Sequence, residues 1–154
     1  MIYYEFTASL QQISTYAFRD LAQDGESGLI NRDLASACPN LTDIGMQAFS
    51  RAFKQVTGKD TVIIPGSVTG IGQNGFRYNG ELGITTIQLG TENNNSALTE
   101  VGSSAFLAIP STSVGNPYKI NIYTDNTSKP IWAEVKTAGT LANGSEPTIS
   151  FITG

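Results

Sequence analysis

The pattern of apolar residues changes near Lys59, and this change constrains the fold more than any other feature. Before it, apolar residues recur every three or four positions, which is typical of helices packed on one face. After it, short β-branched runs alternate with Gly- and Asn-rich turns, which is typical of strands. The sequence therefore predicts an α+β fold in which N-terminal helices, two or three in number, pack on an antiparallel β-sheet or small β-sandwich.

Three segments of the N-terminal part have helical spacing. The first covers residues 7–23, the second residues 27–37, and the third runs from a cap at Asn40 to a stop at Gly58. The second is expected to end at Cys38, because a residue that precedes proline avoids helical geometry. The apolar stripe of the third segment is wide, and we interpret it as a core helix that packs on a sheet.

The C-terminal part carries seven candidate strands. They cover residues 61–65, 75–79, 82–89, 105–109, 118–124, 131–137 and 148–152. Asn79-Gly80 predicts a tight hairpin turn, and Asn143-Gly144 predicts a turn before the last strand. Strands joined by short turns favour antiparallel pairing.

The chain of 154 residues has the length of one domain. We expect a single domain over residues 1–154, with residues 1–58 mainly helical and residues 59–154 mainly antiparallel β. We see no linker and expect no internal repeat.

Charged residues make up only 14% of the chain, against about 25% in typical soluble domains. Neutral polar residues replace them, and such groups cost less to desolvate at a contact than ions do. The net charge is −4 and the nine basic residues are scattered. This pattern argues against nucleic-acid and anionic-membrane partners, which require clustered Lys and Arg.

The absence of histidine excludes Ser–His–Asp and Cys–His catalysis. The single cysteine, Cys38, is expected to be a buried small hydrophobic residue. A pair of carboxylates could still converge in space, so a carboxylate-based enzyme stays as the third hypothesis. We otherwise expect no catalytic residue, no cofactor and no metal.

Two motifs have a chemical appearance. Residues 70–75 match the spacing G-x-G-x-x-G, but a strand-like segment follows where dinucleotide binding requires a helix. Oxygen ligands for calcium gather at residues 92–95 and 125–126 without a calcium-loop spacing. We interpret both as turns.

The composition favours a non-enzymatic structural or assembly protein, and we expect a virion component such as a phage head-decoration (cement) or tail protein. Its partners would be further copies of itself and other structural proteins. Aromatic residues and the Asn-rich loop are the candidate contacts. The predicted interface comprises Tyr3, Tyr4, Asn93, Asn94, Asn95, Tyr123, Trp132 and Phe151.

The alternative is a secreted or surface-exposed binding module, such as a pilin-like ectodomain or an adhesin. Residues 1–6 lack the basic and apolar regions of a signal peptide, which favours synthesis in the host cytoplasm followed by incorporation into a virion. The extracellular setting remains the alternative location.

Overall fold

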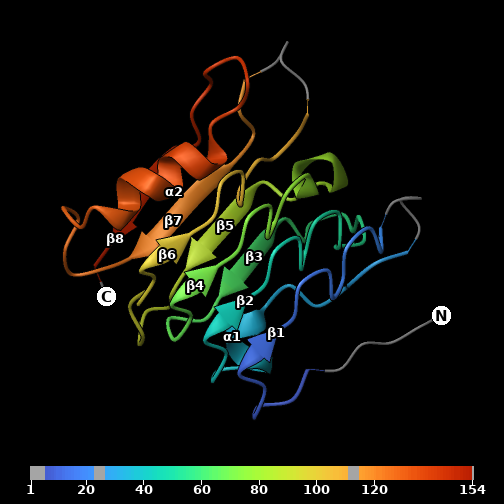
Figure 1. Ribbon diagram of the computed structural model, residues 1–154, viewed down its shortest axis with the longest axis horizontal. Helices are drawn as coiled ribbons and strands as arrows, with labels where there is room; N and C mark the ends of the chain where they lie inside the picture. The colour runs from blue at the N-terminus through green and yellow to red at the C-terminus, as the bar shows by residue number, and fades with distance from the viewer. Residues whose placement is uncertain (1–5, 23–26, 111–114, 154) are drawn as a thin grey trace.

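Two parallel four-stranded sheets form the framework of the computed structural model (Figure 1), which describes residues 6–22, 27–110 and 115–153. The first sheet contains β1 (Gln12–Ile13), β2 (Asp43–Ile44), β4 (Gly70–Ile71) and β6 (Glu100–Val101) in that order. The second contains β3 (Thr61–Ile64), β5 (Thr86–Leu89), β7 (Lys119–Tyr123) and β8 (Thr148–Ile152). Every strand pairing in the two sheets is parallel.

The strands alternate between the sheets along the chain, so the backbone winds as a solenoid. From β2 onward, each strand of the first sheet is followed by one of the second, until α2 (Ile131–Gly139) precedes β8. The other regular elements are the short α1 (Leu34–Ala37) and a 3-10 turn, η1 (Asn79–Leu82). This arrangement contradicts the predicted fold class, because the N-terminal part is not a helical layer and the sheets are not antiparallel.

A four-fold sequence repeat underlies the winding, contrary to our expectation of none. Each coil contains an apolar residue, two variable residues, Ile or Val, Gly or Ser, two variable residues, Ala or Gly, and then Phe. The four copies end at Phe18, Phe49, Phe76 and Phe106. They recur at intervals of about 30 residues, within the range of solenoid repeats.

The four phenylalanines stack along the axis of the solenoid. Successive ring centroids lie 5.4, 5.0 and 6.1 Å apart, with planes 23°, 9° and 14° from parallel. Phe49, Phe76 and Phe106 are fully buried. Together with the inward residues of the strands, this stack forms one continuous core.

Close contact between coils explains the glycine of the repeat. A Cβ at Gly72 would lie 2.5 Å from the backbone nitrogen of Met46, and one at Gly45 would lie 2.5 Å from that of Thr15. The same position in the first coil is Ser14, which is exposed. A side chain is therefore excluded wherever another coil lies against this position.

The apparent N-terminal helices are mostly the corners of the coils. The tight turns that follow the first-sheet strands point an apolar residue inward every few positions, which imitates helical spacing. Their amides bond to the next coil instead of along a helix: Phe18 N donates to Ala48 O at 2.8 Å, and Phe49 N donates to Gly75 O at 2.8 Å. Only residues 34–37 of the predicted second helix are helical, and this helix does end before Cys38, as predicted.

Three of the seven predicted strands are present with nearly the predicted bounds. Residues 61–64, 119–123 and 148–152 are strands, and the turn at Asn143-Gly144 is present. Residues 75–79 and 105–109 are instead corners of coils, and of residues 82–89 only 86–89 form a strand. Residues 131–137 belong to α2, which buries Ile131, Trp132, Val135 and Ala138 at helical spacing.

The predicted hairpin at Asn79-Gly80 is also wrong. Asn79 begins η1, and its buried side chain connects adjacent coils. Its Nδ2 donates to Phe49 O at 2.8 Å and to Phe76 O at 3.1 Å, while its Oδ1 accepts from Ala52 N at 3.0 Å. Asparagine here satisfies backbone groups at a corner where no strand pairing is available.

The helix α2 lies at the C-terminal end of the solenoid, beside β7 and β8 (Figure 1). Phe106 N donates to Ala138 O at 3.2 Å, and the indole Nε1 of Trp132 donates to Asn126 O at 2.9 Å. The helix thereby covers the last phenylalanine of the stack, which would otherwise be open to water. Terminal caps of this kind are a general need of solenoids.

Candidate functional site

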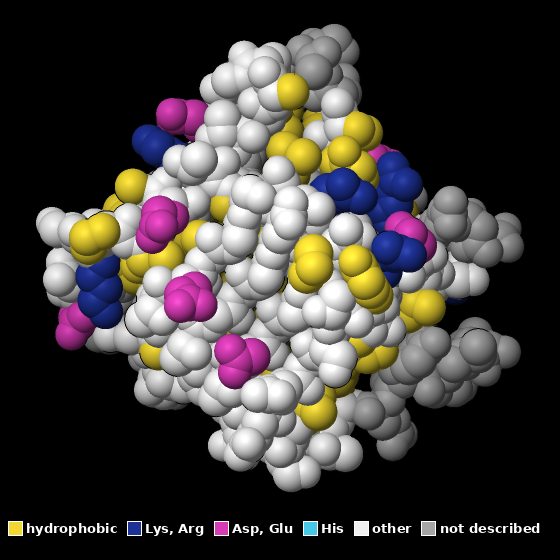
Figure 2. Space-filling view, in the orientation of Figure 1, with side chains coloured by type: hydrophobic (Ala, Val, Ile, Leu, Met, Phe, Trp, Pro, Cys, Tyr) yellow, Lys and Arg dark blue, Asp and Glu magenta, His cyan; other side chains and the backbone are white. Residues whose placement is uncertain are grey.

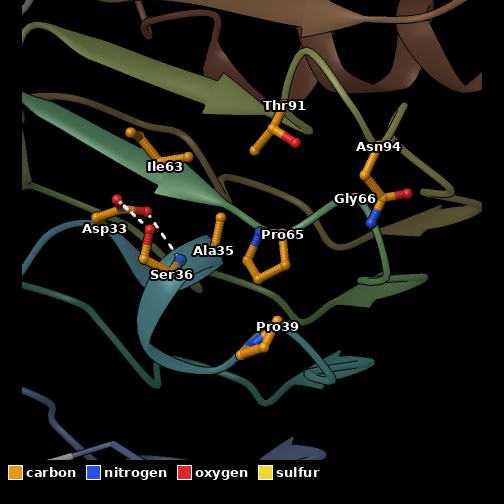
Figure 3. Close-up of a pocket in the computed structure, with 9 residues that line it drawn as sticks. All are labelled: Asp33, Ala35, Ser36, Pro39, Ile63, Pro65, Gly66, Thr91 and Asn94. Carbon is orange, nitrogen blue, oxygen red and sulfur yellow. Dashed lines mark hydrogen bonds between the residues drawn. The ribbon is translucent and has the colours of Figure 1, made fainter. Parts of the chain in front are cut away.

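A shallow pocket of about 330 Å³ lies between α1, the end of β3 and the turn that follows β5 (Figure 3). Figure 3 shows Asp33 and Ser36 on one side and Thr91 and Asn94 on the other, with Pro65 between them. The lining residues are Asp33, Ala35, Ser36, Pro39, Ile63, Pro65, Gly66, Thr91 and Asn94.

The chemistry of this pocket is limited by the role of Asp33, the single ionisable residue among those that line it. Its Oδ1 accepts from the backbone N of Ser36 at 3.0 Å, and its Oδ2 accepts from the Ser36 hydroxyl at 2.7 Å. Asp33 is therefore the N-cap of α1. The pocket brings no second carboxylate to Asp33, so it does not provide an acid–base pair.

Cys38, at the end of α1, is buried, as predicted from the sequence. Its Sγ donates to Leu34 O at 3.2 Å. Burial, with a smaller contribution from the negative charge of Asp33, raises the pKa of the thiol to about 11. The protonated thiol is a poor nucleophile, so this cysteine has the character of a core residue.

A second candidate site lies on the corner of the solenoid that links the two sheets. We call it the corner patch and define it as Tyr16, Arg19, Arg51, Arg77 and Tyr78, contributed by three successive coils. The coils are held in register here by backbone bonds, in which Asp20 N donates to Ser50 O at 2.8 Å and Arg51 N donates to Arg77 O at 3.0 Å. The rigid backbone fixes the spacing of the side chains.

Each guanidinium of the corner patch lies over a tyrosine ring. The Cζ of Arg19 is 4.6 Å from the ring centroid of Tyr16. Tyr78 takes two arginines, with the Cζ of Arg51 at 5.0 Å and that of Arg77 at 4.4 Å. Such cation–π contacts hold the flat guanidinium groups in place, so these side chains lose little further conformational entropy when a ligand binds.

The positive charge of the corner patch is only partly neutralised. Arg19 Nε lies 3.6 Å from Asp20 Oδ2, and Arg51 Nη2 lies 3.5 Å from Glu81 Oε1. Arg77 forms no salt bridge with any residue that the structure describes, and its buried Nε has no hydrogen-bond partner there. In Figure 2, Lys and Arg side chains gather with hydrophobic ones over this corner, at the right of the view.

The predicted interface residues are spread over the molecule. Asn93, Asn94 and Asn95 are exposed on the turn beside the pocket, and Tyr123 is half-buried on β7. Phe151 is 41% exposed on β8, whereas Trp132 is buried in α2. Tyr3 and Tyr4 lie outside the described residues. None of the predicted interface residues that the structure describes lies in the corner patch.

The corner patch was missed because its residues are far apart in the sequence and follow no linear motif. Only alignment of the repeats reveals it: Arg19 and Arg77 occupy the same position of their coils, and Arg51 and Tyr78 share the next one. The basic residues are scattered along the chain, as expected, but the fold brings three of the arginines, Arg19, Arg51 and Arg77, together at the corner patch.

Within residues 6–22, 27–110 and 115–153, no three His, Cys, Asp or Glu residues lie close enough together to hold a metal ion. No helix in those ranges combines the length and the hydropathy that a membrane span requires.

In comparisons with known proteins, no family model, no curated protein and no solved structure matches this chain.

Proposed function

We propose that this protein is a non-enzymatic binding module whose corner patch receives an acidic segment of a partner protein. The observation that carries the proposal is the row of three arginines on tyrosine rings, two paired with acids and Arg77 unpaired among the described residues. Arginine and tyrosine are the residues that most often dominate the binding energy of protein interfaces.

Charge complementarity selects the class of partner. Guanidinium groups bind carboxylates through paired hydrogen bonds, and the half-buried Arg77 has no acidic partner among the described residues. Asp20 and Glu81 compete for the other two arginines, so an acidic partner would exchange with them. Such exchange favours moderate affinity and dependence on salt.

The two settings expected from the sequence remain proposals. A surface-exposed binding module suits the corner patch directly, although the helical layout of a pilin does not match this fold. A virion assembly protein is the second candidate, and the uncharged edge of β8 favours it. Both act through protein–protein contacts.

The proposal is tested by titrating the protein with a glutamate-rich peptide and measuring the binding by calorimetry at low and at high salt concentration. We expect binding that weakens with salt and that falls at least about 10-fold in the double variant Arg51→Ala/Arg77→Ala. The matched control is Lys129→Ala/Lys136→Ala, which removes the same charge far from the corner patch. Equal losses in both double variants would show that only net charge matters, and would contradict the proposal.

A further inference from the structure

The strand β8 forms one edge of the second sheet (Figure 1). It pairs with β7 over all five of its residues, and in the part of the chain that the structure describes no strand lies on its other side. An open edge presents unpaired N–H and C=O groups to any strand that approaches.

The backbone of β8 shows which groups are free. Thr148 N donates to Tyr118 O at 3.0 Å, and Ile152 O accepts from Thr124 N at 3.1 Å. The backbone N–H and C=O groups of Thr148 and Ile152 therefore point toward β7. Because these directions alternate along a strand, Ser150 also faces β7, whereas Ile149 and Phe151 direct their N–H and C=O groups outward.

The side chains leave this edge unprotected. The sequence of β8, Thr-Ile-Ser-Phe-Ile, contains no charge and no proline, the usual devices that block pairing at an edge. Phe151 has the register of the core residues Leu89 and Ile122, yet it is 41% exposed. The opposite edge of the sheet is different, because residues 29–33 form isolated bridges to Phe53 and Ile63 there. This segment carries the charged residues Arg32 and Asp33.

We propose that a second copy of this chain pairs with β8, antiparallel, about a two-fold axis at Ser150. In this register, Ile149 of each copy lies opposite Phe151 of the other copy. The outward N–H and C=O groups of these residues then form two hydrogen-bonded pairs across the axis. The apolar side chains Ile149 and Phe151 then meet on the core side. With no ion to desolvate, β8 is complementary to itself, as an isologous interface requires.

The register has a geometric consequence at Ser150. Residues on the axis form a non-hydrogen-bonded pair with Cα atoms about 4.5 Å apart, within the range that a disulfide spans. The two copies of Thr148 would be offset by four residues, about 13 Å along the strands. A cysteine at position 150 therefore links the copies, whereas one at position 148 does not.

Disulfide trapping tests this prediction in the full chain, where the native Cys38 is buried. Ser150→Cys and Thr148→Cys variants are oxidised with diamide and analysed without reductant. We expect a dimer from Ser150→Cys that dithiothreitol reverses, and at least about 10-fold less from Thr148→Cys, because its thiols would exceed the reach of a disulfide. Equal cross-linking of the two variants, or none at position 150, would overturn the proposal.

A second variant examines the interface without a cysteine. Phe151→Lys places a charge on the exposed edge, and circular dichroism verifies that it folds. Sedimentation velocity over a range of concentrations should show self-association of the native chain and a monomer for Phe151→Lys. Persistent association of Phe151→Lys would locate the interface elsewhere. Because β8 carries no residue of the corner patch, failure of this proposal leaves the proposed binding function untouched.

Discussion

Phe49 stacks on Phe76 with ring centroids 5.0 Å apart and planes 9° from parallel, although the two residues belong to different coils. Equivalent residues of adjacent repeats contact one another in this way throughout the solenoid. The stability of each coil therefore depends mainly on its immediate neighbours.

Truncation of this stack should be costly. Phe76→Ala removes a fully buried ring that contacts Phe49, Phe53 and Phe106, and we expect a loss of about 3–5 kcal/mol in the free energy of unfolding. The control Ile30→Ala, at a 41% exposed site outside the stack, should cost less than about 1.5 kcal/mol. Urea denaturation measures both, and similar losses would argue against the stacked core.

The contact between coils predicts that alanine is harmful at a position where no positive φ is required. In Gly72→Ala the new methyl would press on the backbone of Met46, and we expect a destabilisation of about 1–3 kcal/mol. Ser14→Ala, at the equivalent exposed position of the first coil, should change the unfolding free energy by about 0.5 kcal/mol or less. A more stable Gly72→Ala variant would mean that the coils are not in contact there.

The corners impose left-handed backbone on two non-glycine residues in each of the first three coils and, in the last coil, on Ser104, with φ 57°. Glycine relieves a strain of about 1–2 kcal/mol at such a position. It also adds freedom to the unfolded chain, at a cost of about 0.4–1 kcal/mol. Ser104→Gly should therefore raise the melting temperature, whereas Ser103→Gly, which has no strain to relieve, should lower it. Equal shifts in thermal unfolding would contradict the assigned corner.

The stability of the fold should decrease in alkaline solution because of a buried thiol. The pKa of Cys38 rises from 9.0 in the unfolded chain to about 11 in the fold, so the unfolded state loses its proton first as the pH passes 9. The loss grows between pH 9 and pH 11 and approaches about 2.7 kcal/mol above pH 11, at 1.36 kcal/mol for each pKa unit. Burial also raises the pKa of Tyr118, which adds a further loss above pH 10.

Urea denaturation at pH 8 to 10 measures this effect of the thiol. The variant Cys38→Ala should show a much flatter dependence on pH between 9 and 10 than the native chain does, because it lacks the group that ionises on unfolding. An unchanged slope in Cys38→Ala would mean that another group is responsible.

The long strands were predictable because their alternation is visible locally. In β7, Ile120 and Ile122 are buried while Lys119 is exposed, a pattern that any half-buried strand produces. Such alternation does not state whether neighbouring strands are parallel, so the pairing was assigned wrongly. Parallel pairing is decided by connections that run through the first sheet, whose strands are only two residues long.

The corners were misread because local spacing there has two explanations. The spacing of Leu10, Ile13 and Ala17 fits a helix. It fits equally well a coil in which these three residues come from successive sides and all point toward the core. The reverse error occurred in α2, where Ile131 and Val135 fit both an alternating strand and a helix. Recognition of the repeat through Phe18, Phe49, Phe76 and Phe106 would have resolved the corners and revealed the corner patch.

The amide chemical shifts of the protein during titration with a glutamate-rich peptide test the proposed function most directly. The account predicts that the largest shifts gather at the corner patch, around Tyr16, Arg51 and Tyr78, and that Arg77→Ala reduces them. Shifts centred on the pocket beside Asp33, or spread equally over Lys129 and Lys136, would contradict it.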